Sequence, residues 1–125
     1  MYEVYVAARF EAAHRLVGDF GPAARMHGHT YRIEVIVCGQ RLAEDGTLYD
    51  IGDLNRAVSD LAATLNYRDL EEVPGLAGVN TTAEAVADFC WETLAPSLRD
   101  RGLDSLVVRI WESQDAYASR EDALD

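Results

Sequence analysis

Apolar and polar residues alternate in two segments near the N-terminus. In residues 1–10, MYEVYVAARF, every second side chain from Tyr2 to Phe10 is apolar. In residues 29–39, HTYRIEVIVCG, the apolar positions begin at Tyr31 and again recur with a period of two. This period places one row of side chains on one face of an extended chain, so both segments are predicted to be β-strands.

Two later segments have a similar but shorter pattern. Residues 47–51, TLYDI, follow the turn sequence EDGT and predict a short third strand. Residues 105–113, SLVVRIWES, place Leu106, Val108 and Ile110 on one face. They predict the last strand of the sheet.

Two segments have a helical period instead. Apolar residues from Leu54 onward fall at i, i+3, i+4, i+7, i+8 and i+11, which predicts a helix over 53–65 with Asp53 as its N-cap. A second helix is expected from Thr81 to about Leu94, ending before a proline. Thr81 and Glu84 have the spacing of a capping box.

The resulting order is strand, strand, strand, helix, helix, strand. This order favours an α+β fold with an antiparallel sheet and both helices on one face. No internal repeat or linker-like stretch interrupts residues 1–125, so one domain is expected.

Composition narrows the classes of partner. The formal net charge is −11, from 22 acidic and 11 basic residues, which argues against binding to nucleic acid or to an anionic membrane surface. No apolar run reaches the roughly 18 residues of a membrane span. The first residues lack the pattern of a secretory signal, and Cys38 and Cys90 both lie in apolar segments. A cytoplasmic protein with reduced, buried cysteines is expected.

Three histidines, all in the first quarter of the chain, carry the candidate chemistry. His27 and His29 flank a single glycine, and His14 follows the first strand. If extended structure begins at His27, the two side chains of the HGH motif point the same way, and pairing of the first two strands brings His14 to them. Three imidazoles without a fourth protein ligand are typical of a catalytic zinc site with an open position. The alternative is three turn histidines without a shared role.

Several acidic residues could serve either a ligand or the local structure. Glu112 has the same parity as Ile110, so it continues the apolar face of the last strand. A buried carboxylate would need a donor-rich partner, whereas a strand that has already ended would leave Glu112 in water. Glu84 fits a capping box, and Asp50 and Asp53 fit the start of the first helix.

Several motifs together resemble a known family. In chain order they are FEAAHRL, HGHTYRIEVIVCG, DIGDL, TTAEAVADF and VRIWES. They resemble the 6-pyruvoyl-tetrahydropterin synthase and 6-carboxy-tetrahydropterin synthase family over nearly the whole chain. The resemblance implies a T-fold, with a four-stranded antiparallel sheet, two helices on one face, and a homohexamer of two stacked trimers whose sheets join into a barrel.

The resemblance also implies a site. A zinc ion would be held by His14, His27 and His29. A pterin-like small molecule would be anchored by Glu112. Thr82 and Glu84 would lie near the same ligand.

The implied reaction is that of a lyase. The family substrate is dihydroneopterin triphosphate, whose side-chain oxygens zinc can polarise as a Lewis acid. A nearby base then moves protons and triphosphate leaves. Cleavage of a side-chain carbon–carbon bond as well gives the carboxy product.

The chain departs from the family at the proton-handling triad of Cys, Asp and His. Ala23 stands four residues before the HGH motif, where the family has its cysteine, and Asn66 and Tyr67 stand where it has the Asp-His pair. Alanine cannot accept a proton. An unperturbed phenol, with a pKa of about 10, is a poor base at neutral pH.

Three interpretations stay open. In the first, the chain is a zinc-dependent lyase with a replacement base and altered or reduced activity on a pterin or related substrate. In the second, it is a non-catalytic pterin- or zinc-binding protein. In the third, it is an ordinary synthase with compensating residues. Asp19 and Asp69 are candidate replacement bases, although such loop acids are more often simply solvated.

Overall fold

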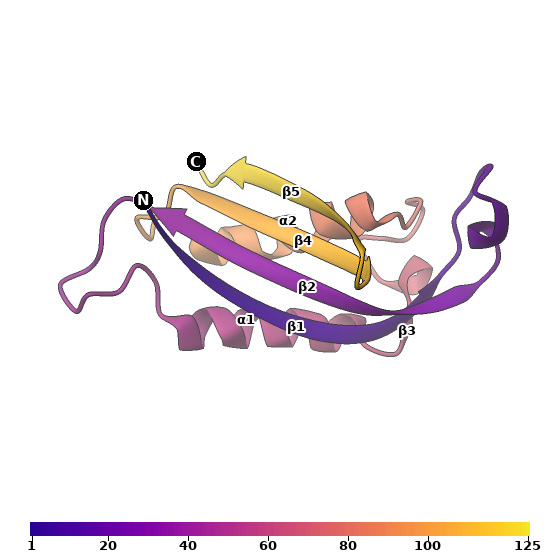
Figure 1. Ribbon diagram of the computed structural model, residues 1–125, viewed down its shortest axis with the longest axis horizontal. Helices are drawn as coiled ribbons and strands as arrows, with labels where there is room; N and C mark the ends of the chain where they lie inside the picture. The colour runs from indigo at the N-terminus through magenta and orange to yellow at the C-terminus, as the bar shows by residue number, and fades with distance from the viewer.

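A single sheet spans the computed structural model, which covers residues 1–125 (Figure 1). It contains five strands in the order β3-β1-β2-β4-β5. Their bounds are β1 Tyr2–His14, β2 His27–Gly39, β3 Arg68–Asp69, β4 Ser105–Ser113 and β5 Ala116–Ala123. The pairings are antiparallel except for the short contact between β1 and β3.

The first two strands form the longest ladder in the molecule. They pair from Tyr2 opposite Gly39 to His14 opposite His27, without a bulge. Both strands are longer than the alternating segments predicted, because the alternation continues through Ala12 and His14 in β1 and starts at His27 in β2. In Figure 1 the connection between them projects beyond the rest of the sheet. It carries η1 (Gly21–Ala24).

Two helices cover one face of this sheet. Helix α1 (Ile51–Leu65) packs against β1, and α2 (Ala83–Leu98) packs against β4 and β5. The alternating apolar side chains of β1, β2 and β4 that form the core face these helices, and neither helix packs on the opposite face of the sheet. The predicted α+β architecture is therefore confirmed.

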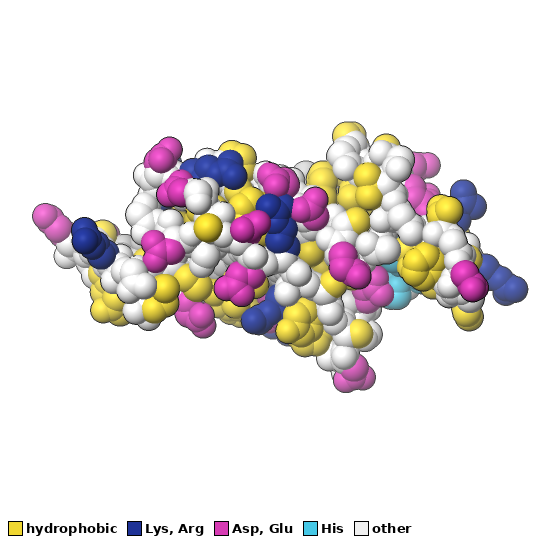
Figure 2. All heavy atoms as spheres, turned by 90° about the horizontal axis from the view of Figure 1, so that it is seen from above, with side chains coloured by type: hydrophobic (Ala, Val, Ile, Leu, Met, Phe, Trp, Pro, Cys, Tyr) yellow, Lys and Arg dark blue, Asp and Glu magenta, His cyan; other side chains and the backbone are white.

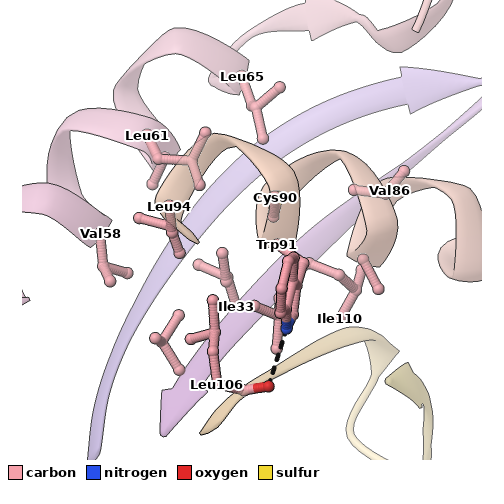
Figure 3. Close-up of a cluster of buried hydrophobic side chains, with 14 of the residues drawn as sticks. Ile33, Val58, Leu61, Leu65, Val86, Cys90, Trp91, Leu94, Leu106 and Ile110 are labelled. Carbon is pink, nitrogen blue, oxygen red and sulfur yellow. Dashed lines mark hydrogen bonds between the residues drawn. The ribbon is translucent and has the colours of Figure 1, made fainter. Parts of the chain in front are cut away.

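The core lies between the sheet and the helices (Figure 3). Trp91 of α2 is almost fully buried and its indole Nε1 donates a 2.8 Å hydrogen bond to the Leu106 carbonyl of β4. Ile33 and Ile110 pack around it from neighbouring strands. Each fully buried side chain of this kind contributes about 1.5–3 kcal/mol relative to an exposed one. The core therefore fixes α2, and with it the segment that precedes α2, against the sheet.

The predicted strand at residues 47–51 is wrong. The segment is a turn in which Asp50 caps α1, its Oδ1 accepting a 2.8 Å hydrogen bond from the amide of Gly52. Helix α1 accordingly begins at Ile51, and Asp53 lies in its first turn rather than at the cap. The apolar Leu48 and Tyr49 suggested a strand, but they are half-buried against the edge of the core.

The predicted bounds of α2 are also wrong. Thr82, not Thr81, is the N-cap, and its Oγ1 accepts a 3.1 Å hydrogen bond from the amide of Ala85. The helix continues through Pro96 to Leu98. Proline is tolerated there because it lies on the exposed side and the carbonyl it leaves unpaired belongs to Glu92, which is also exposed.

The strand count differs from the predicted four as well. β5 has no apolar alternation, because its side chains are mostly exposed on both faces, and β3 is only two residues long. Neither segment has the apolar alternation that identified the other strands.

None of the helices combines the length and the hydropathy that a membrane-spanning segment needs.

Candidate metal centre and adjoining cavities

Three histidine side chains meet where the ladder of β1 and β2 ends. His14 lies opposite His27, and His29 lies opposite Ala12, so all three imidazoles project from the helix-covered face. Their ring centroids are 4.5 Å apart for His14–His27, 5.1 Å for His14–His29 and 4.8 Å for His27–His29. One nitrogen from each ring lies within 4.8 Å of the others. The strand pairing thus assembles a group that could hold one metal ion.

Backbone carbonyls set the orientation of two of these rings. The Nδ1 atom of His14 lies 2.7 Å from the Thr81 carbonyl, and that of His27 lies 2.7 Å from the Arg25 carbonyl. A carbonyl can only accept, so each Nδ1 carries the hydrogen and each Nε2 keeps its lone pair. A hydrogen bond of this kind is the usual support of a metal-ligating imidazole.

Two nitrogens of the cluster lack any hydrogen-bond partner. The Nε2 atoms of His14 and His29 are both buried and unpaired. An unpaired buried polar atom is costly, and nearly all such atoms in folded proteins have partners. The donor set of three converging imidazoles, with buried Nε2 atoms in need of a partner, therefore fits a divalent metal ion.

The environment of His29 favours its neutral, metal-binding form. Burial lowers the pKa of His29 below its ordinary value of 6.5, although the charge of Glu112 acts in the opposite direction. Because the pKa is lowered, the neutral imidazole predominates at neutral pH and is lost only as the pH falls below that ordinary value.

Thr81 has a different role from the one predicted. It is fully buried, and its carbonyl holds His14 instead of its hydroxyl capping α2. Residues 14 and 81 are far apart in the chain, so no local pattern could have indicated this contact.

Glu112 lies near the histidines at the end of β4. It is half-buried, so the end of the strand does not leave it fully in water. A cavity of about 390 Å³ is lined by Glu112 together with Thr82 and Glu84, so the three predicted ligand residues share one recess. Tyr117 of β5 contributes an aromatic wall to it.

Two further cavities adjoin His29. One of about 730 Å³ is lined by His29, Glu112, Trp111 and two arginines, Arg9 and Arg32. The other, of about 510 Å³, is lined by His29 and by Tyr67 and Asp69. Figure 2 shows histidine atoms reaching the surface beside acidic side chains. His29 is therefore accessible from more than one side, and sequence reasoning had identified neither arginine.

The three positions of the family triad have structural roles or none here. The carbonyl of Ala23, in η1, accepts a 2.9 Å hydrogen bond from the Leu16 amide. Asn66 ends α1, and its Oδ1 accepts a 2.9 Å hydrogen bond from the Glu11 amide. Tyr67 has a positive φ of 57° and is 83% exposed. Neither Asn66 nor Ala23 offers a free group for proton transfer.

The two candidate replacement acids lie in different places. Asp69 is half-buried, caps the short helix η2 (Leu70–Glu72) and lines the cavity shared by His29 and Tyr67. Asp19 is exposed in the loop between β1 and β2. Of the two, only Asp69 lines a cavity with a residue of the histidine cluster.

Comparison with known proteins agrees with the architecture and the motifs. The family model described as 6-pyruvoyl tetrahydropterin synthase matches residues 3–123. The 6-pyruvoyl tetrahydrobiopterin synthase of Dictyostelium discoideum is 32% identical over 103 residues, covering 73% of this chain and 76% of the relative. The 6-carboxy-5,6,7,8-tetrahydropterin synthase of a Synechocystis strain is 32% identical over 99 residues, covering 75% of each chain.

Solved structures show the same fold. The 6-pyruvoyl tetrahydropterin synthase of Caenorhabditis elegans superimposes with a TM-score of 0.82, covering 98% of this chain and 96% of that one at 24% identity. The predicted T-fold is therefore confirmed, with five strands in this chain rather than four.

The geometry predicts that one metal ion binds per chain and stabilises the fold. A ligand present at 100 times its Kd stabilises the folded state by about 2.7 kcal/mol. We expect metal to raise the melting temperature of the wild-type protein relative to a chelator-treated sample. His29→Ala should abolish most of this difference. Melting curves and elemental analysis of the purified protein measure both effects.

Asp19→Asn is the matched control, because it removes a possible ligand atom from the loop between the histidines without altering the cluster. It should bind metal like the wild type. Stoichiometric metal retained by His29→Ala would contradict the assignment.

Proposed function

The chain belongs to the 6-pyruvoyl tetrahydropterin synthase family, and we propose that it is a zinc-binding member that recognises a pterin-like small molecule. Family membership supports a tetrahydropterin synthase-like function. The observation that carries the proposal is the convergence of three imidazoles beside a half-buried glutamate and a cavity. The ligand set, the pterin anchor and the level of activity are the parts that experiments must test.

Zinc is the metal that the donor set favours. Imidazole nitrogens suit zinc and related first-row metals, whereas magnesium and calcium prefer oxygen ligands. Three protein ligands leave a position for water or substrate, as in catalytic zinc sites. When bound, zinc would supply Lewis-acid polarisation of a ligand oxygen.

Glu112 is the proposed anchor of the pterin. The amino-pyrimidine edge of a pterin offers two adjacent N–H donors, which one carboxylate can accept with both oxygens. Thr82 and Glu84 line the same recess, and the ring of Tyr117 offers a surface for an aromatic ligand. In the proposed complex, the ring would lie in this recess and its side chain would extend toward the histidines.

Ordinary synthase activity is in doubt because the triad is replaced. The amide oxygen of Asn66 is occupied by the Glu11 backbone, and Tyr67 projects into solvent within this chain. Asp69 is the best-placed substitute base, since it lines a cavity with His29. We therefore favour a lyase with altered or reduced activity. The second candidate, a non-catalytic pterin- or zinc-binding protein, follows if Asp69 serves only as the cap of η2.

We further propose that the protein is a homo-oligomer, and specifically a hexamer as in the family. The outer edge of β1 is paired only at Ala12 and Ala13, and the outer edge of β5 is unpaired. Exposed edges of this length favour pairing with another chain.

Replacing the anchor should weaken ligand binding selectively. Glu112→Gln keeps the size of the side chain but removes a charge-assisted acceptor, so the affinity for neopterin should fall by about tenfold or more. Metal content and far-ultraviolet circular dichroism should be unchanged. Titration calorimetry measures the affinity, with Glu121→Gln on β5 as the exposed control. Equal affinity of wild type and Glu112→Gln would refute the anchor.

Turnover of dihydroneopterin triphosphate should be low. General acid–base groups contribute typically about 10²–10⁴-fold, so we expect a rate at least 10²-fold below that of a relative with the complete triad. Chromatography of pyruvoyl and carboxy products measures it. Ala23→Cys alone should not restore the rate, because the other two triad positions are still changed. A rate equal to that of the relative would disprove this expectation.

Asp69→Asn separates the two candidate functions. A further fall in the residual rate, with ligand affinity intact, would indicate the replacement base. No measurable turnover in either protein, with tight pterin binding, would favour the non-catalytic candidate.

The oligomer should persist in dilute solution. Light scattering coupled to size exclusion at micromolar concentration should report six chains per particle. A monomeric mass under these conditions would contradict the proposed assembly.

A further inference from the structure

A tyrosine hydroxyl lies buried beside the histidines without any hydrogen-bond partner. Tyr31 is fully buried, and its hydroxyl is one of only three buried side-chain polar atoms in the structure without a partner. Its ring stacks on Phe10, with centroids 4.9 Å apart and planes within 9°. The edges of His14 and His29 contact its other side, at centroid distances of 5.9 Å and 5.2 Å.

Packing alone does not explain this hydroxyl. A phenylalanine would keep the stack on Phe10 and the contacts with both imidazoles. A buried hydroxyl without a partner destabilises the fold, so it requires an explanation. The two other unpaired atoms, on His14 and His29, would be satisfied by the proposed metal ion. The Tyr31 hydroxyl needs a different partner, one that its surroundings can supply in another state of the protein.

Glu112 is the group placed to be that partner. The ladder between β2 and β4 ends with Arg32 opposite Trp111, so Tyr31 and Glu112 are the next residues beyond that last pair on the two strands. The carboxylate is close enough for its charge to act on both Tyr31 and His29. It is half-buried near the end of β4, in the bulge between Trp111 and Ser113, and a residue in a bulge is not held by the regular ladder.

We propose that, when a ligand binds, the Tyr31 hydroxyl donates a hydrogen bond to the Glu112 carboxylate and holds it in the orientation that receives the ligand ring. This inference rests on the proposed role of Glu112. A carboxylate has about four lone-pair sites, enough for one phenol and two N–H donors at once. The hydroxyl is not exposed, so it acts on the ligand through Glu112 and is a positioning residue.

This arrangement predicts opposite effects of one substitution on stability and on binding. In the ligand-free protein Tyr31→Phe removes an unpaired polar atom, so the melting temperature should stay the same or rise. In the complex it removes a hydrogen bond to a charged group, so neopterin affinity should fall by on the order of tenfold. Metal content should be unchanged, because the histidine contacts with the ring are kept.

A double-mutant cycle tests whether Tyr31 acts through Glu112. Affinity for neopterin is measured by calorimetry for wild type, Tyr31→Phe, Glu112→Gln and the double variant. We expect Tyr31→Phe to weaken binding in the wild-type background and to have much less effect in the Glu112→Gln background. Tyr49→Phe is the matched control, since Tyr49 is a half-buried tyrosine at the far edge of the core, and it should not change affinity.

The outcomes separate this inference from the proposed function. If Glu112→Gln does not weaken neopterin binding, Glu112 is not the anchor, and the inference about Tyr31 is refuted together with that assignment. If Glu112→Gln weakens binding but Tyr31→Phe does not, the anchor stands and the inference is overturned. Additive effects, a loss of metal or a lower melting temperature in Tyr31→Phe would also overturn it.

Discussion

The antiparallel pairing of β1 with β2, in one uninterrupted register, is the constraint on which the site depends. It places His14 opposite His27 and aligns His29 with Ala12 on the same face. A shift of one residue would turn every side chain of one strand to the other face, moving one half of the cluster to the opposite side of the sheet. The apolar row of β1 and β2 prevents this shift, because the same slip would expose the core. The same strand register therefore positions both the apolar core and the histidine cluster.

Helix α2 completes the site from the other side. The segment before it brings the Thr81 carbonyl to His14 and places Thr82 and Glu84 in the recess of Glu112. That segment is held by the packing of Trp91 against β4. A site built in this way joins residues from opposite ends of the chain, and its precision depends on the core. The unpaired buried atoms at its centre reduce stability.

Two of the three replaced triad positions make contacts within the scaffold, whereas Tyr67 is largely exposed. Asn66 ties the end of α1 to β1 through the Glu11 backbone, and the carbonyl of Ala23 stabilises the loop before the HGH motif. The three histidines and Glu112 are present, whereas the three triad positions hold no Cys, Asp or His.

The sequence by itself determined the α+β class, the ladder of β1 and β2, β4, the existence of both helices, and the three histidines on one face. Each of these features has a local signal, either a period of two, a helical period or the spacing of a motif. The sequence could not indicate β5, whose side chains are exposed on both faces, or the true start of α2, where two neighbouring threonines were equally good caps. Only the tertiary structure decided that Thr81 holds His14, that Arg9 and Arg32 line a cavity with His29, and that the Tyr31 hydroxyl is buried without a hydrogen-bond partner. These contacts join residues far apart in the chain, and they follow from strand register and helix packing rather than from any local pattern.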